Sequence, residues 1–137
     1  MIAAIIGGVI ERIGARLTAA AAIEDPVEAV RSILTGGFAI MDEYGDLMAT
    51  LVSGHMPAAC KAQFEKQDEI ALTAAIIRKG ITAGAFRSDL DPLLAAALLI
   101  GTLVPWNYQQ PRVSHSVAQI SAGFLDLCLN GVKVAAP

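Results

Sequence analysis

The side chains with the clearest chemical potential in this sequence are the carboxylates of Asp42, Glu43 and Asp46, which surround Tyr44. Clustered carboxylate oxygens can hold a hard metal ion. The same cluster is also typical of a solvated turn between two helices, and we favour that interpretation. We therefore predict neither a metal site nor a cofactor for this chain.

The other reactive side chains form no catalytic arrangement. His55 and His115 are far apart in the sequence, and there is no Ser/His/Asp spacing, no phosphate-binding loop and no apolar pair of catalytic carboxylates. A pocket role for His55 is an alternative to a surface position. Cys60 and Cys128 match no metal or disulfide spacing, so we expect small buried thiols in a reducing cytosol. The chain is predicted not to be an enzyme.

Composition favours an all-α protein with an apolar surface. Of the 137 residues, 55% are hydrophobic but only 5% are aromatic, and alanine and leucine dominate. The net charge of -3 without a basic stripe predicts no direct contact with nucleic acid. The most apolar run, Leu93 to Val104, is shorter than the roughly 20 residues that a bilayer requires. We expect a cytoplasmic protein, without membrane contact, that associates with itself.

A bundle of about six helices would position these side chains. Asp25-Pro26 and Asp91-Pro92 each combine an N-cap residue with a proline at the first helical position. Gly84 is a natural C-cap, and Ser114 is expected to cap the last helix. Apolar residues at steps of three and four predict helices over residues 2–23, 26–41, 45–52, 58–83, 92–104 and 114–130. The inward stripe of the fourth is predicted to be Phe64, Ala71, Leu72, Ala75 and Ile76.

The helix after Pro92 is apolar on every side. Leu93 to Ile100 are all apolar, so no face of these two turns is left for water. A chain of this size covers only part of such a helix, which predicts packing against a partner as well as against its own core. The last helix also carries two apolar faces, and which faces turn outward is left open by the sequence.

The run from Ile77 to Pro92 resembles the carboxy-terminal domain of TetR-type transcriptional regulators. It contains Gly84-x-Phe86-Arg87 at a helix end, then Asp89-Leu90-Asp91-Pro92, then an Ala/Leu-rich helix with a glycine. The resemblance extends less specifically to Gly131. It implies an all-α regulatory domain over residues 1–137, in which residues 1–84 supply ligand-pocket helices and residues 85–137 supply dimerisation helices.

The resemblance also implies a homodimer, in which the last two helices of each subunit form a four-helix bundle, and a pocket for a small apolar effector. Bulky, adaptable side chains on the middle helices are the pocket candidates, with plain core packing as the alternative: Phe38, Met41, Tyr44, Met48, Leu51, Phe64 and Leu72. Small residues and leucines on the last two helices, with Trp106 at the edge, are the dimer candidates: Leu94, Ala97, Leu98, Gly101, Trp106, Ala118, Ala122, Leu125 and Leu129.

The sequence departs from the family pattern because no helix-turn-helix segment precedes the regulatory helices. The sequence thus predicts a ligand-sensing and dimerisation domain without its own DNA-binding head, arising from a fragment, a mis-assigned start or a truncated product. The alternative is a stand-alone interaction protein that pairs with an intact regulator and blocks its DNA binding.

Overall fold

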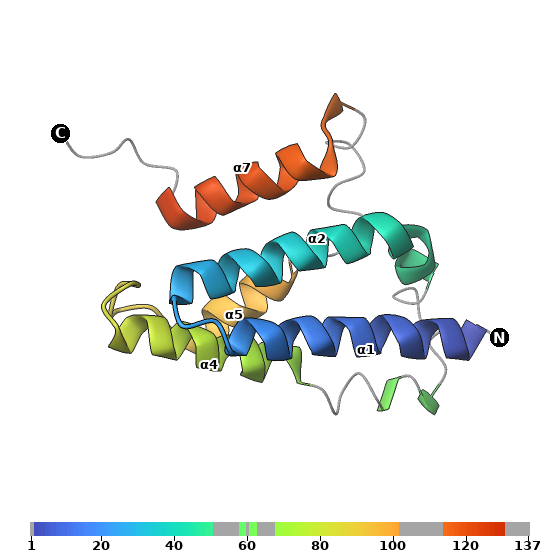
Figure 1. The fold of residues 1–137 in the computed structure, drawn as a ribbon, viewed down its shortest axis with the longest axis horizontal. Helices are drawn as coiled ribbons and strands as arrows, with labels where there is room; N and C mark the ends of the chain where they lie inside the picture. The colour runs from blue at the N-terminus through green and yellow to red at the C-terminus, as the bar shows by residue number, and fades with distance from the viewer. Residues whose placement is uncertain (1, 51–57, 60, 63–67, 102–113, 131–137) are drawn as a thin grey trace.

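The computed structural model describes residues 2–50, 58–59, 61–62, 68–101 and 114–130, and within these ranges it contains helices and no strand (Figure 1). The elements are α1 (Ile2–Ala21), α2 (Pro26–Thr50), α4 (Glu69–Thr82), α5 (Pro92–Gly101) and α7 (Val117–Asn130). The predicted all-α class is therefore confirmed. None of these helices is long and apolar enough to cross a membrane.

The central helix of the bundle is α2. It runs between α1 and α7 and antiparallel to α1, and it also contacts α4 (Figure 1). The main core cluster joins these four helices and consists of Leu17, Ala20, Ala29, Val30, Ile33, Leu34, Phe38, Ile76 and Leu125. A second cluster, around Ile6, Val9, Ile10 and Ile40, closes the other end of the α1–α2 pair.

The packing partner of α5 is α4. Ala74 and Ile77 of α4 contact Ala96 of α5 in a third buried cluster, to which Phe86 and Leu90 of the connecting loop add. Thus α4 has two buried sides, one toward α5 and one toward α1 and α2.

Three of the predicted helix caps are confirmed. The Asp25 carboxylate accepts a hydrogen bond from the Val27 amide at 3.0 Å, and Asp91 accepts from Leu93 and Leu94 at 3.0 and 3.1 Å. Gly84 has a φ of 76°, in the left-handed region that glycine enters without steric penalty.

The predicted break near Tyr44 is present as a kink rather than a loop. Tyr44 has non-helical angles, with a φ of -120° and a ψ of 15°, and it separates two helical stretches that together make up α2 as far as Thr50. The start of the last helix was predicted wrongly. The last helix is capped by Ser116 rather than Ser114. The Ser116 hydroxyl accepts from the Gln119 amide at 3.1 Å, and the Gln119 side chain accepts from the Ser116 amide at 2.8 Å, which is a capping box.

The predicted helix over 58–83 is also divided. Residues 58–59 and 61–62 are helical, but α4 begins at Glu69, after Asp68. This start changes which residues face inward. Thr73, Ala74, Ile76, Ile77 and Gly80 are buried, whereas Ala71, Leu72 and Ala75 of the predicted stripe are exposed.

Candidate functional site

The inward face of α4 carries polar groups at its amino-terminal end. Glu69, Thr73, Ile76 and Gly80 are spaced by four, three and four residues, so they lie on one stripe of the helix. Ile76 on this stripe belongs to the core cluster shared with α1 and α2. Thr73 and Glu69 therefore face the same interior as Ile76, about one and about two turns closer to the start of α4, respectively.

Within the described part of the chain, each of these two side chains has a buried oxygen without a hydrogen-bond partner: the hydroxyl oxygen of Thr73 and Oε1 of Glu69. Thr73 is 0% exposed. Burial raises the pKa of Glu69 from 4.5 to about 7, and no charged group among the described residues offsets this shift. Most buried polar groups in proteins are paired, so two unpaired oxygens on one stripe require an explanation.

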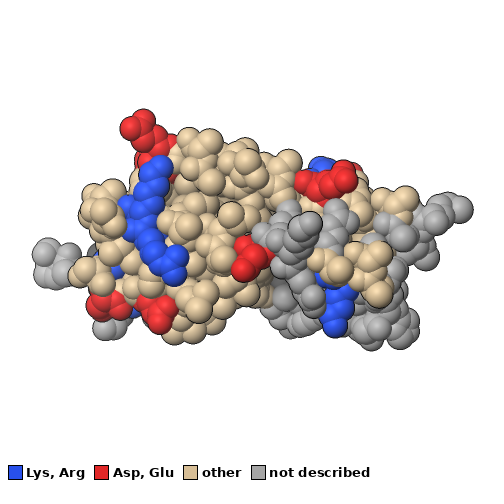
Figure 2. All heavy atoms as spheres, turned by 90° about the horizontal axis from the view of Figure 1, so that it is seen from below, with Lys and Arg blue, Asp and Glu red and all other residues tan. Residues whose placement is uncertain are grey.

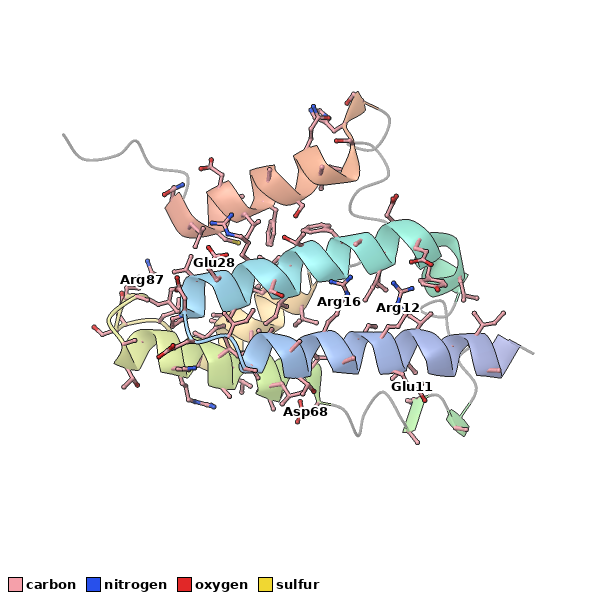
Figure 3. The ribbon with its side chains drawn as sticks, in the orientation of Figure 1. Glu11, Arg12, Arg16, Glu28, Asp68 and Arg87 are labelled. Atoms are coloured by element: carbon pink, nitrogen blue, oxygen red, sulfur yellow. The ribbon has the colours of Figure 1, made fainter. Side chains whose placement is uncertain are left out.

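The start of α4 holds Glu69 in this position. Asp68 adopts a φ of 44°, which is unusual for a residue with a Cβ, and its carboxylate accepts from the Ala71 amide at 3.1 Å. Figure 3 shows Asp68 at this helix start, beside α1. The cap fixes Glu69 as the first helical residue and so sets the direction of its side chain.

The predicted pocket residues are not brought together around one described cavity. Phe38 is buried in the main core, with its ring at 5.8 Å from that of Phe124 in an edge-to-face arrangement. Met41 and Tyr44 pack instead against the second cluster. Leu72 is 38% exposed on the outward side of α4. Leu51, Phe64 and the side chain of Met48 lie outside the described residues, as do His55 and Cys60.

Arg12 of α1 is bound at the kink of α2 and lies, like Arg16, between the two helices (Figure 3). Its guanidinium donates to Glu43 at 2.9 Å and to the Tyr44 hydroxyl at 3.0 Å, and it lies 5.4 Å from the centre of the Tyr44 ring. Hydrogen bonding to Arg12 lowers the pKa of Glu43. One member of the predicted acidic cluster is thus engaged in an ion pair. Among the residues that the structure describes, no three potential ligands are grouped to hold a metal ion.

A groove of about 590 Å³ lies between α2 and α7. One predicted pocket residue, Phe38, and four predicted dimer residues border it together. The full lining is Arg31, Thr35, Phe38, Ala39, Ala118, Ser121, Ala122, Leu125, Asp126, Leu129 and Asn130. Leu125 is buried against α2, whereas Ala118, Ala122 and Leu129 are exposed. Cys128, expected to be buried, is exposed.

Exposed leucines cover one side of α5. Leu93, Leu94 and Leu98 are 56, 59 and 63% exposed, respectively. Ala97 is half-buried, and Gly101 has open space around it. Trp106 lies outside the described residues. Only Ala96 of α5 is buried, so the helix is only partly covered by the described part of the chain.

Charged groups are sparse on the face seen from below in Figure 2. Lys and Arg form a band toward one end and a smaller group toward the other, acidic side chains lie at both ends and near the middle, and most of the remaining described surface of that face is uncharged.

Comparison with known proteins identifies the fold. No protein-family model matches the sequence, and no curated protein matches it. Among solved structures, a TetR/AcrR-family regulator from Thermobifida fusca aligns with a TM-score of 0.80 and 20% identity, over 96% of this chain and 73% of its own. The TetR-family regulator PfmR from Thermus thermophilus aligns with a TM-score of 0.78 and 19% identity, over 97% and 75%.

A third similar structure is the regulator FadR from Bacillus subtilis in complex with stearoyl-CoA. It aligns with a TM-score of 0.66 and 16% identity, over 96% of this chain and 73% of that one. All three proteins are transcriptional regulators, and the alignments extend over nearly all of the present chain. The chain therefore has a TetR-like helical fold.

Proposed function

We propose that these residues form the ligand-sensing and dimerisation domain of a TetR-type transcriptional regulator. The exposed leucines of α5 carry the dimerisation part of this proposal, because three large apolar side chains on one short helix are typical of a covered surface. The TetR-like fold supports the regulatory part and favours binding over catalysis.

In the proposed dimer, α5 and α7 of one subunit pack against the same helices of the partner. The small residues of α7, Ala118 and Ala122, would allow close helix approach. Leu94 and Leu98, one turn apart on α5, would lose most of their exposed surface. Full burial of a leucine contributes about 1.5–3 kcal/mol, so a few such side chains supply much of a dimer's affinity.

In the proposed domain, the helices of residues 1–84 enclose the ligand pocket, and those of residues 85–137 form the dimer surface. The stearoyl-CoA complex of FadR is an example of a protein of this fold that binds a molecule with a long apolar portion. In this chain the proposed effector is likewise small and largely apolar. It would lie among α1, α2 and α4.

Size-exclusion chromatography with light scattering tests the dimer. The wild-type chain is expected at twice the monomer mass of 14.3 kDa. The variant Leu94→Glu/Leu98→Glu is expected to be a folded monomer. Ile5→Glu, at a 47% exposed position on α1, is the matched control and is expected to stay dimeric. A well-folded wild-type monomer would refute the proposed dimerisation.

A further inference from the structure

The two unpaired oxygens on α4 are the strongest unexplained feature of the interior. They belong to Glu69 and Thr73, and the proposed dimer surface on α5 and α7 does not involve them. Leaving a buried polar group without a hydrogen bond is unfavourable by about 1–3 kcal/mol. A partner from outside the chain would remove this penalty.

Geometry limits the partner to one that can reach both groups. Residues four apart on a helix have Cβ atoms about 5–6 Å from each other, so one small polar group can lie between their side chains. It must donate hydrogen bonds, because a carboxylate only accepts and a hydroxyl can accept. A primary ammonium has three N–H donors and is small enough to serve both oxygens.

The charges on the surrounding helices favour a cation over an anion. On α1, Arg12 is held by Glu43 and Tyr44, and the Arg16 side chain packs over Gly36 of α2. Among the described residues, no charged group contributes to the pKa shift of Glu69, so neither these groups nor Glu28 and Arg31 of α2 neutralise its carboxylate. The helix α5 has no charged residue. An anionic head group beside Glu69 would be repelled, and a cationic one would replace the hydration that the carboxylate has lost.

We propose that Glu69 and Thr73 form a polar anchor for an effector that carries a protonated primary amine on an apolar body. This inference rests on the proposed ligand-sensing function and adds the chemical class of the ligand. The ammonium donates to Oε1 of Glu69 and to the hydroxyl oxygen of Thr73.

Three probes with the same alkyl chain test the inference by calorimetry: n-decylammonium, n-decanol and n-decanoate. The wild-type chain is expected to bind decylammonium about tenfold or more tightly than the other two, as expected for hydrogen bonds to a charged group. Glu69→Gln is expected to abolish this preference, and Thr73→Val to weaken decylammonium binding several-fold. Glu11→Gln removes the same charge from an exposed position on α1 and is expected to leave all three affinities unchanged.

The outcomes separate the two proposals. Equal binding of the three probes, or a preference that survives Glu69→Gln, would overturn the ammonium anchor while supporting an apolar effector pocket. Tighter binding of decanoate would overturn it in favour of an anionic effector. Binding of none of the probes to the folded chain would overturn the anchor and also contradict the proposed small apolar effector.

Discussion

The buried carboxyl group of Glu69 should make the stability of the protein depend on pH in a direction opposite to that of most carboxylates. Its pKa is about 7 in the folded chain, against an ordinary value of 4.5. Because the folded-state pKa is the higher one, the folded protein binds more protons than the unfolded chain between these values. Its contribution to stability is present below pH 4.5 and is lost as pH rises through about 7.

The magnitude follows from the two pKa values. A difference of about 2.5 between them corresponds to about 3 kcal/mol over the full titration, at about 1.4 kcal/mol per pKa unit. Between about pH 5 and about pH 8 the expected loss is about 2.5 kcal/mol. Glu69→Gln has no titrating group at this position and should lack this loss. The variant should therefore gain about 2.5 kcal/mol relative to wild type over that interval.

Urea unfolding followed by circular dichroism measures this difference. Wild type and Glu69→Gln are compared at both pH values and at one protein concentration, since the stability of a dimer depends on concentration. Other titrating groups cancel in the comparison, and Glu11→Gln controls for the loss of one negative charge. A difference between wild type and Glu69→Gln that is the same at both pH values would refute the desolvation of this carboxyl group.

Further substitutions test the packing of α4, the start of α7 and the kink of α2. Gly80→Ala would place a methyl group where the ring of Phe86 packs against α4, so it should destabilise the fold by about 1–3 kcal/mol. Gly8→Ala meets no atom within 4 Å and should stabilise the fold by up to about 1 kcal/mol. Thermal unfolding measures both changes. Ser116→Ala should cost about 1 kcal/mol by loss of the cap, with Ser114→Ala nearly neutral; equal losses would contradict the capping box. Arg12→Gln removes the ion pair with Glu43 and should speed amide hydrogen exchange at the α2 kink relative to wild type. This difference should disappear as pH falls through the lowered pKa of Glu43, because the protonated carboxyl group no longer forms the ion pair in wild type either.

Local chemistry explains why the fold class and most helix ends were predictable. An Asp-Pro pair combines a side-chain acceptor with a fixed φ, and glycine at a left-handed position has no steric competitor. Such signals act over a few residues and depend little on the rest of the fold. The helix starts at Pro26 and Pro92 and the end near Gly84 are therefore recognisable in the sequence alone.

Local sequence signals of this kind did not predict which residues of α4 face inward. The sequence from Ala58 to Ala83 has no proline or glycine before Gly80, so periodicity alone suggested one helix and a stripe that includes Leu72. The actual start depends on Asp68 adopting a left-handed conformation, which intrinsic preferences disfavour. The Asp68-Glu69 pair was a usable signal, since aspartate caps helices and glutamate favours the first turn.

The face of α5 that turns outward was unpredictable for another reason. A helix that is apolar on all sides has no periodicity to orient it, so the buried Ala96 and the exposed Leu94 and Leu98 are distinguished only by the contacts that α4 makes. The pocket candidates were selected for size and flexibility, and those properties also suit a core. Phe38 accordingly packs edge-to-face with Phe124 in the main cluster.

The position of α4 connects the two proposed activities. Its stripe with Glu69 and Thr73 faces α1 and α2, and its other buried side, with Ala74 and Ile77, packs directly on α5. A leucine in place of Thr73 would avoid an unpaired hydroxyl, so the polar stripe is locally unfavourable for stability, as is often found at functional sites. Neutralising Glu69 by a bound cation would strengthen the contact of α4 with the α1–α2 interior. Because close-packed helices move as units, any resulting shift of α4 would be passed to the leucine-covered helix proposed to join the two subunits.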